Sequence, residues 1–310
     1  MASNLETLVT VFGGSGFLGR NVVRALCKRD YRVRVAVRRP ELAGYLQPSG
    51  KVGQVHVVQA NLRYPASVEA ALRDSDVVIN LVGILTEGGK QSFDAVQAKG
   101  AETVAKAAAV AGARLVHVSA IGADAESPSR YAKAKAAGEA AVLAAVPSAT
   151  IFRPSVMFGP EDQFTNRFAA LARMSPVLPL MGGDTKMQPV YVGDVASAIA
   201  DAVDGKTKAG ATYELGGPEV LTMREIMQFI LATTDRGRML APLPFGLAKF
   251  QALFLQFAPG PLDHWSHHSE RPHGFVPAVP LASCPVPSGS RQCVAHSGRN
   301  PDRHGTRLRP

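Results

Sequence analysis

GGSGFLG, at Gly13–Gly19, is the stretch of this sequence that decides the fold. It directly follows the apolar run Leu8–Phe12 and opens a segment in which Leu18, Val22 and Leu26 recur at helical spacing. A buried strand, a glycine turn and a helix in this order bind the pyrophosphate of a dinucleotide. The expected phosphate-binding residues are Gly13, Ser15, Gly16, Phe17, Leu18 and Gly19.

Each glycine of this turn has a separate expected role. Gly13 turns the chain out of the strand, Gly16 lets the backbone approach phosphate, and Gly19 lets the helix pack close to the sheet. The spacing is GxxGxxG, which differs from the broader GxGxxG fingerprint. Glycines are also common in tight turns that bind no ligand. The prediction of a nucleotide site therefore depends on the strand before this turn and the helix after it.

Composition and charge narrow the class of protein. The chain has 310 residues, 46% of them hydrophobic and 19% charged, which is typical of a globular protein. Little sequence precedes the first strand, apolar runs are too short to span a bilayer, and three cysteines do not suggest a disulfide framework. We therefore expect a cytoplasmic protein. The net charge of +9 is spread out rather than gathered into a basic stripe, so no nucleic-acid partner is expected.

Strands and helices alternate through the first half of the chain. The expected strands are at 32–37, 54–58, 76–81, 114–118 and 150–153, and the expected helices are at 93–111 and 129–145. Repeated βα units predict an α/β protein with a doubly wound parallel sheet, the Rossmann class. Such a sheet binds its ligand at the carboxyl ends of the strands.

The expected domains are a core and a smaller C-terminal lobe. Residues 1–154 form the NAD(P)-binding core, whose sheet is completed by later segments. Residues 155–262 form a lobe for substrate or partner, with a returning strand at 188–192 and a helix at 222–234. The apolar segment 245–257 is either a buried helix of this lobe or a helix that docks on a membrane surface or a hydrophobic partner.

The tail, residues 263–310, has a different composition. It contains six of the eight histidines and two of the three cysteines, but no lysine and no apolar periodicity. The histidine and cysteine spacing fits no zinc signature, so no metal site is expected. We interpret the tail as disordered sequence read out of frame, and a natural disordered tail is the alternative.

Residues after three other strands complete the expected cofactor site. Arg38 and Arg39 follow the second strand, where an acidic residue selects NAD and an arginine pairs with the 2′-phosphate of NADP. NADPH is therefore expected to bind better than NADH. The remaining expected contacts are Asn61 and Leu62 near the adenine, Val82 and Gly83 beside the cofactor backbone, and Pro154 at a later strand end.

A possible catalytic set follows the fifth strand. Ser119 ends that strand, and Tyr131 and Lys135 lie four residues apart on the next helix, so they share a face. A lysine ammonium and the positive charge of a nicotinamide lower the pKa of a nearby phenol, which allows it to move a proton. Lys135 is also expected to bond the nicotinamide ribose. An ordinary tyrosine and lysine on an exposed helix are the alternative.

From these residues the chain resembles an extended or atypical short-chain dehydrogenase/reductase, over roughly Leu8 to Leu262. Four further runs narrow the resemblance to the nucleotide-binding accessory subunit of respiratory complex I and its bacterial homologues: Asn80–Leu85, His117–Asp124, Arg153–Asp162 and Gln188–Val195. The resemblance implies tight NADPH binding without known turnover. The sequence around Ser119 departs from the serine-rich stretch of active members.

Two functions remain open. The first is a structural or weakly catalytic NADPH-binding protein whose partners are complex I subunits or a membrane surface, which implies a peripheral position on the inner membrane. The second is an NADPH-dependent reductase, epimerase or dehydratase that acts on a sugar or a hydroxy-lipid. The fold does not identify a substrate, because specificity lies in the variable lobe.

Overall fold

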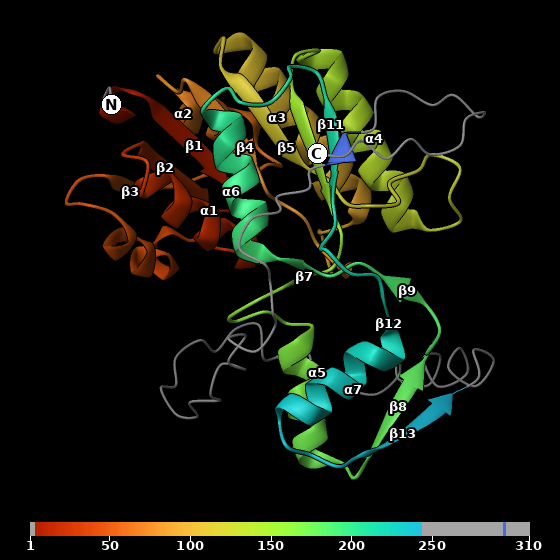
Figure 1. Cartoon of the computed structure of the whole chain (residues 1–310). Coiled ribbons are helices and arrows are strands. Elements are labelled where there is room, and N and C mark those ends of the chain that lie inside the picture. The colour runs from red at the N-terminus through yellow and green to blue at the C-terminus, as the bar shows by residue number, and fades with distance from the viewer. Residues whose placement is uncertain (1–3, 244–293, 296–310) are drawn as a thin grey trace, which may run out of the picture. The chain divides into compact units, whose positions relative to one another are not determined.

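The computed structural model describes residues 4–243 and 294–295 (Figure 1). The described residues divide into two compact units. Unit 1 contains 4–155, 192–216 and 294–295, and unit 2 contains 156–191 and 217–243. The apolar segment 245–257 and the tail 263–310, apart from 294–295, lie outside the described residues.

Unit 1 is built on one sheet with the strand order β14-β11-β6-β5-β4-β1-β2-β3. All neighbouring strands are parallel except β11 and β14, which are antiparallel. The strands are β1 (Leu8–Phe12), β2 (Arg32–Val37), β3 (Val55–Gln59), β4 (Val77–Asn80), β5 (Arg114–Val118), β6 (Thr150–Pro154), β11 (Thr212–Leu215) and β14 (Val294–Ala295). The strand order reverses between β1 and β4, which confirms the doubly wound Rossmann class.

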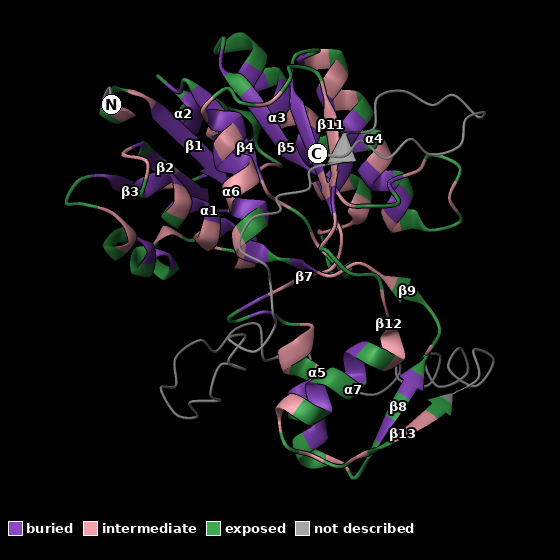
Figure 2. Ribbon diagram, viewed as in Figure 1, coloured by how far each residue is buried: buried purple, intermediate pink, exposed green. Residues whose placement is uncertain are grey.

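Helices cover both faces of this sheet. One buried cluster joins the sheet residues Phe12, Val78, Leu115 and Ile151 to α2 (Pro65–Leu72), α3 (Lys99–Val110) and α4 (Arg130–Ala145). The other face carries α1 (Phe17–Cys27) and α6 (Val192–Val203), which pack on each other. The strands are buried between these layers, as the purple central strands of Figure 2 show. Apolar runs on both faces are what a parallel sheet between helices requires.

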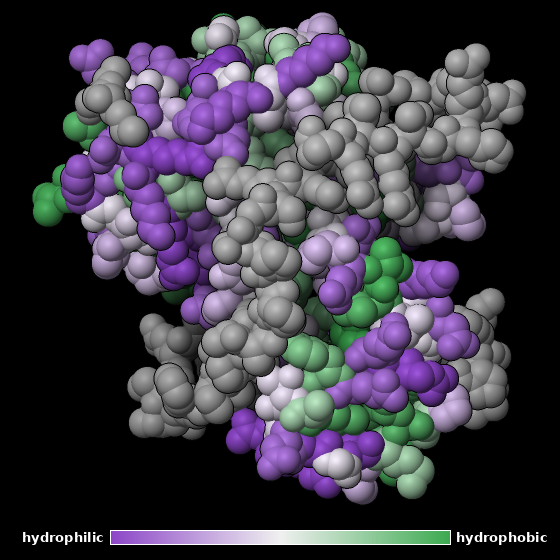
Figure 3. Space-filling model, in the orientation of Figure 1, coloured by the Kyte–Doolittle hydropathy of each residue, from purple (hydrophilic) through white to green (hydrophobic). Residues whose placement is uncertain are grey.

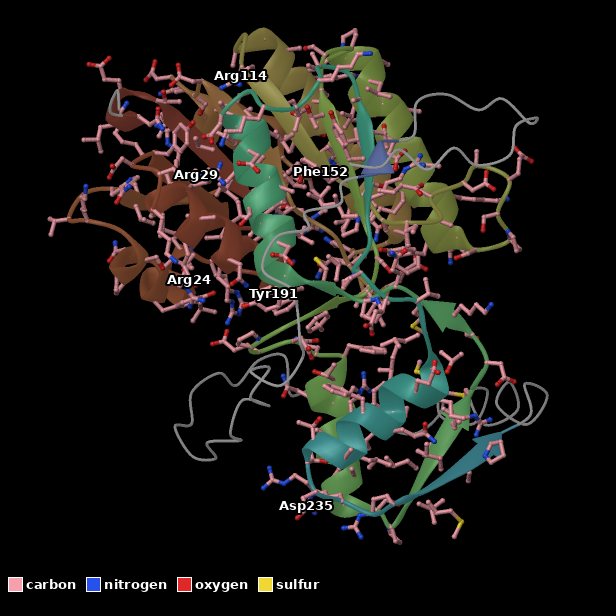
Figure 4. All side chains as sticks on the ribbon, in the orientation of Figure 1. Arg24, Arg29, Arg114, Phe152, Tyr191 and Asp235 are labelled. Atoms are coloured by element: carbon pink, nitrogen blue, oxygen red, sulfur yellow. The ribbon has the colours of Figure 1, made fainter. Side chains whose placement is uncertain are left out.

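Ion pairs join the turn after α1 to the C-terminal end of α6. The guanidinium of Arg29 contacts Asp201 at 2.8 Å and Asp204 at 2.6 Å, and the hydroxyl of Tyr31 donates to Asp204 at 2.8 Å. Arg114 donates from β5 to the carbonyl oxygen of Val203 at 3.0 Å. Figure 4 shows the labelled Arg29 and Arg114 beside α6. The segment 192–216 is therefore fixed to unit 1 although it follows a long excursion into unit 2.

Two expected elements differ from the structure. The expected helix at 93–111 is divided into a π-helical turn, Asp94–Ala98, and α3. The strand expected to return at 188–192 is instead the two-residue β10 (Val190–Tyr191), which pairs with β7 (Met157–Phe158) in unit 2. The strand that extends the main sheet is β11, which pairs with β6, so 192–216 groups with unit 1 rather than with the lobe.

Unit 2 has its own small core. Parallel strands β8 (Val177–Met181) and β13 (Met239–Leu243) pack Leu178 and Leu180 against α5 (Thr165–Met174) and α7 (Met223–Thr233). A second pair, β9 (Lys186–Met187) and β12 (Leu221–Thr222), is antiparallel. Thr222 and Glu225 form a capping box at the start of α7. Figure 3 shows apolar residues, in green, among polar ones on the visible face of this unit.

Candidate nucleotide site in unit 1

The turn between β1 and α1 is shaped by its glycines. Gly13 has φ +77°, a left-handed conformation that glycine adopts readily. The N–H of Gly13 donates to Ala36 at 3.3 Å, and the N–H of Gly16 donates to the carbonyl oxygen of Gly13 at 3.1 Å. Gly16 is the N-cap of α1, with no side-chain cap and no acidic residue in the first turn. The first N–H groups of α1 are thus available to an anion such as a pyrophosphate.

Close packing explains the other glycines of the turn. A Cβ on Gly19 would collide with the carbonyl oxygen of Gly13, and a Cβ on Gly14 would lie 2.7 Å from Val35 Cγ1. Gly16 is different, because its backbone is extended at φ −74° and a Cβ there would be 3.3 Å from Gly13 O. Packing requires a glycine at position 14, which was not among the expected site residues. At Gly16 packing makes no such demand, and the expected reason for a glycine is the space that a phosphate would occupy beside the turn.

Two side chains that sequence reasoning missed hold the outside of this turn. The hydroxyl of Tyr45 donates to the carbonyl oxygen of Ser15 at 2.7 Å, and Arg20 Nη2 donates to the same oxygen at 3.5 Å. The Arg20 guanidinium lies over the Tyr45 ring, 5.5 Å from its centroid. Tyr45 belongs to a short 3₁₀ segment, Gly44–Ser49, which no periodic pattern in the sequence marked.

Arg38 and Arg39 directly follow β2, beside the glycine turn. Both are exposed, and neither guanidinium pairs with an acidic side chain among the described residues. The strand before them is in register with β1, so that Ala36 is opposite Phe12. Two unpaired positive charges therefore lie at the strand end where a Rossmann protein holds the adenosine ribose, which fits a 2′-phosphate.

The residues after β3 and β4 have mixed roles. The Asn61 side chain accepts from the N–H of Arg63 at 3.2 Å, which closes a local turn. Leu62 packs against Gly100 of α3, where a Cβ would lie 3.1 Å from Leu62 Cδ1, so its side chain belongs to the core. Val82 is adjacent to the glycine turn, because a Cβ on Gly13 would lie 3.2 Å from Val82 Cγ2. The loops after β1 and β4 therefore meet at the point where the strand order reverses.

Ser119, Tyr131 and Lys135 lie around the ends of β5 and α4. Ser129 caps α4 by accepting from the N–H of Ala132 at 3.5 Å. The half-buried Tyr131 packs edge-on against Phe93, with ring centroids 5.6 Å apart. Burial raises the pKa of the Tyr131 hydroxyl, which is opposite to the direction expected for the complex with a nicotinamide. Ser119 is buried, and its N–H donates to Phe152 at 2.7 Å.

Lys135 is the buried charge of this site. It is 5% exposed, and its Nζ donates to the carbonyl oxygen of Val118 at 3.3 Å. A Cβ on Gly83 would lie 3.4 Å from Nζ, so the lysine reaches the backbone that follows β4. Burial lowers the pKa of Lys135 to about 8, while Glu139 acts in the opposite direction.

Buried Pro154 ends β6, and its carbonyl oxygen accepts from the N–H of Ile121 at 3.1 Å.

The arrangement fits a dinucleotide along the carboxyl ends of β1, β2, β4 and β5. The helix N-terminus suits the pyrophosphate, the exposed arginines suit a ribose phosphate, and Gly83 with Lys135 suits the nicotinamide end. A family model described as "NAD dependent epimerase/dehydratase family" matches residues 9–216. The chain belongs to this family.

Known relatives agree with this assignment. The chain is 41% identical over 250 residues to the mitochondrial NADH dehydrogenase [ubiquinone] 1 alpha subcomplex subunit 9 of Arabidopsis thaliana, covering 79% of this chain and 62% of the relative. It is 37% identical over 199 residues to a ceramide reductase of Caulobacter vibrioides, covering 64% and 62%. The chain thus spans less than two thirds of the length of either relative.

Solved structures share the fold. The dTDP-glucose 4,6-dehydratase of Bacillus anthracis, solved in complex with NAD, is 20% identical and superposes with a TM-score of 0.64 over 76% of this chain and 84% of that one. At this identity the likeness shows the fold alone. The description of the family names NAD as its nucleotide.

Proposed function

We propose that this protein is a structural or weakly catalytic NADPH-binding subunit that associates with respiratory complex I. The observation that carries the proposal is the 41% identity over 250 residues to an alpha subcomplex subunit 9. The proposed cofactor contacts are the N-terminus of α1 for the pyrophosphate and Arg38 with Arg39 for the 2′-phosphate. NADPH is therefore expected to bind more tightly than NADH.

The proposed location is peripheral, on the inner membrane beside complex I. Among the helices that the structure describes, none is both long and apolar enough to cross a bilayer. Attachment would thus depend on partner subunits or on a membrane surface. Isolation of complex I from cells that express a tagged chain should recover this protein together with NADPH, identified by mass spectrometry. Recovery of the chain free of complex I subunits and of nucleotide would contradict the proposal.

A carbonyl reductase is the second candidate. The observation that favours it is Lys135, buried on the same face of α4 as Tyr131, together with the similarity to a ceramide reductase. NADPH would supply a hydride, Tyr131 would donate its proton to the carbonyl oxygen, and the Lys135 ammonium would stabilise the phenolate that remains. The substrate class is a hydroxy-lipid ketone, with a sugar as the alternative.

The two candidates are separated by turnover. If the protein is a reductase, NADPH absorbance falls when a long-chain keto lipid is added, and Tyr131→Phe abolishes that loss without weakening NADPH binding. If it is a subunit without turnover, NADPH stays bound and unoxidised with every carbonyl tested. Tyr64→Phe, at an exposed tyrosine of unit 1, is the matched control.

A further inference from the structure

Buried polar atoms without partners gather near Lys135. In the described part of the chain these atoms are Gln97 Oε1, both ring nitrogens of His117, and Ser119 Oγ. Their residues are 2%, 2% and 4% exposed. A buried polar atom that stays unpaired destabilises the folded state, and native proteins contain few of them. All of them lie at the nucleotide end of the sheet.

His117 and Ser119 lie on one face of the sheet. Alternation along β5 puts them on the same side as Leu115, which belongs to the core beneath α2, α3 and α4. His117 is opposite Asn80 of β4 and Ile151 of β6. A histidine therefore occupies the centre of the face that α4 covers, where apolar side chains are the rule.

The π-helical turn brings Gln97 to the same junction. Its Nε2 donates to the carbonyl oxygen of Ile84 at 2.6 Å, which leaves Oε1 as an acceptor. Gly138 of α4 allows the close approach, because a Cβ there would collide with the carbonyl oxygen of Gln97. Lys135 is one turn before Gly138 on α4. Gln97, Lys135 and His117 thus converge from three elements.

Donors and acceptors at this junction are complementary. Burial and the charge of Lys135 lower the pKa of His117 to about 3, so the ring is neutral and offers one donor and one acceptor. The Lys135 ammonium has three N–H donors, and Val118 accepts one of them. Glu139, one turn after Lys135, is the acidic residue of α4, and its carboxylate is bound by Arg153 at 2.6 Å and 2.9 Å.

We propose that His117 is the positioning residue of Lys135. Its neutral ring accepts a second ammonium N–H through one buried water shared with Gln97 and Ser119, because neither ring nitrogen has a hydrogen-bond partner among the described residues. With Val118 and His117 as acceptors, the third N–H is aimed past Gly83 at the ribose of the nucleotide. This last step rests on the proposed NADPH binding, whereas the contact between His117 and Lys135 does not.

The contact is tested by nitrogen NMR of the whole chain labelled at histidine. His117→Phe identifies the His117 signals, and His56→Phe, at an exposed histidine of β3, is the matched control. We expect one ring tautomer of His117 to dominate at neutral pH and Lys135→Met to change the shift of its acceptor nitrogen. Lys133→Met, at an exposed position of the same helix, should leave it unchanged. His117 signals that are identical in Lys135→Met and the native protein would overturn the proposal.

The effect on the site is tested by calorimetric titration with NADPH. His117→Phe should weaken binding by about tenfold, and His117→Gln, which restores an acceptor, should recover part of the loss. His56→Phe should bind like the native protein. A folded His117→Phe variant with unchanged NADPH affinity would overturn the positioning role. If that variant does not fold, the affinity of His117→Gln and the NMR measurement decide whether His117 positions Lys135. Absence of NADPH binding in the native protein would overturn the proposed function, while the NMR result still decides the inference.

Discussion

The Lys135 ammonium donates to the carbonyl oxygen of Val118 across 3.3 Å, which joins α4 to the last residue of β5. This single bond places a positive charge inside unit 1, 5% exposed, at the nucleotide end of the sheet. A buried ammonium is disfavoured relative to water unless its N–H groups find acceptors. The charge is therefore a cost to the unit, and in the proposed complex a ribose oxygen would reduce that cost by supplying a further acceptor.

The stability of the protein should depend on pH through Lys135. Its pKa is about 8 in the folded protein and near 10.5 when exposed, so the unfolded chain binds the additional proton between these values. The contribution of this residue to the unfolding free energy therefore rises from about pH 8 to about pH 10.5. Lys135→Met should be more stable than the native protein at pH 7, with a difference that shrinks toward pH 10.

The comparison in chemical denaturation must be made between variants, because other groups titrate as well. Burial raises the pKa of Cys27 to about 11 and of Tyr31 to about 12, and both work against stability at high pH. Lys133→Met, on the exposed side of α4, serves as control and should follow the native curve. A Lys135→Met curve parallel to the native one from pH 7 to pH 10 would contradict the prediction.

Arg38 and Arg39 should determine the preference for NADPH. Replacing both with alanine should weaken NADPH binding about tenfold or more, since one charge-assisted contact contributes ~1.5–3 kcal/mol. NADH binding should change little, because no 2′-phosphate is present. Calorimetric titration measures both affinities, and Arg167→Ala in unit 2 is the control. Equal affinity of the native protein for the two nucleotides would exclude this role.

Substitutions at Gly16 and Gly19 should separate binding from folding. Gly16 has an ordinary extended backbone, and a Cβ there would make only one tight contact, 3.3 Å to Gly13 O, so Gly16→Val should fold yet lose nucleotide binding by filling the phosphate space. Gly19→Val should destabilise unit 1 itself, because its Cβ collides with Gly13 O. Thermal melts and binding assays of the two variants check this, and a folded Gly16→Val that binds normally would move the phosphate site elsewhere.

Asp162 should stabilise unit 2 without affecting the nucleotide. Its buried carboxylate accepts from the N–H of Gly159 at 3.1 Å, the N–H of Thr165 at 2.8 Å, the Thr165 hydroxyl at 2.6 Å and the N–H of Asn166 at 3.2 Å. Asp162→Ala removes this N-terminal cap of α5 and should cost ~2 kcal/mol or more. Hydrogen exchange should accelerate in α5 while NADPH affinity stays unchanged, and Asp162→Asn should be intermediate. Unchanged exchange in α5 would refute the capping role.

The sequence predicted the central strands well because their boundaries are local. The strand expected at 32–37 corresponds to β2 and the strand expected at 114–118 to β5, since apolar runs end at charged or glycine-rich turns there. β11 was missed because four residues, Thr212–Leu215, carry too little pattern, and only pairing with distant β6 makes them a strand. The π turn was missed because one additional residue hardly alters the apolar spacing from Val96 to Ala108.

The expected site residues divide in the same way. The shape of the glycine turn could be predicted because Gly13 needs a positive φ and Gly19 a close approach to the turn, while nucleotide binding there stays a prediction. Tyr45 and Arg20 could not, because their contacts with Ser15 depend on how the 3₁₀ segment folds over the turn. His117 did leave a signal, a polar residue inside the apolar run Leu115–Val118, but its neighbours Gln97 and Lys135 come from separate elements. A contact that depends on three elements is not visible in the spacing of one.

The carbonyl oxygen of Gly13 joins the parts of the glycine turn to one another, and Arg38 and Arg39 lie outside these contacts. We therefore expect that phosphate binding and nucleotide choice can be altered separately. The Gly13 oxygen accepts from Gly16 N–H at 3.1 Å and contacts the surface of Gly19, so any insertion within the turn displaces all of its parts at once. Arg38 and Arg39 have no such shared contact and are exposed on the next strand. If the proposed site is right, exchanging these two arginines for acidic residues will favour NADH and leave the glycine turn unchanged.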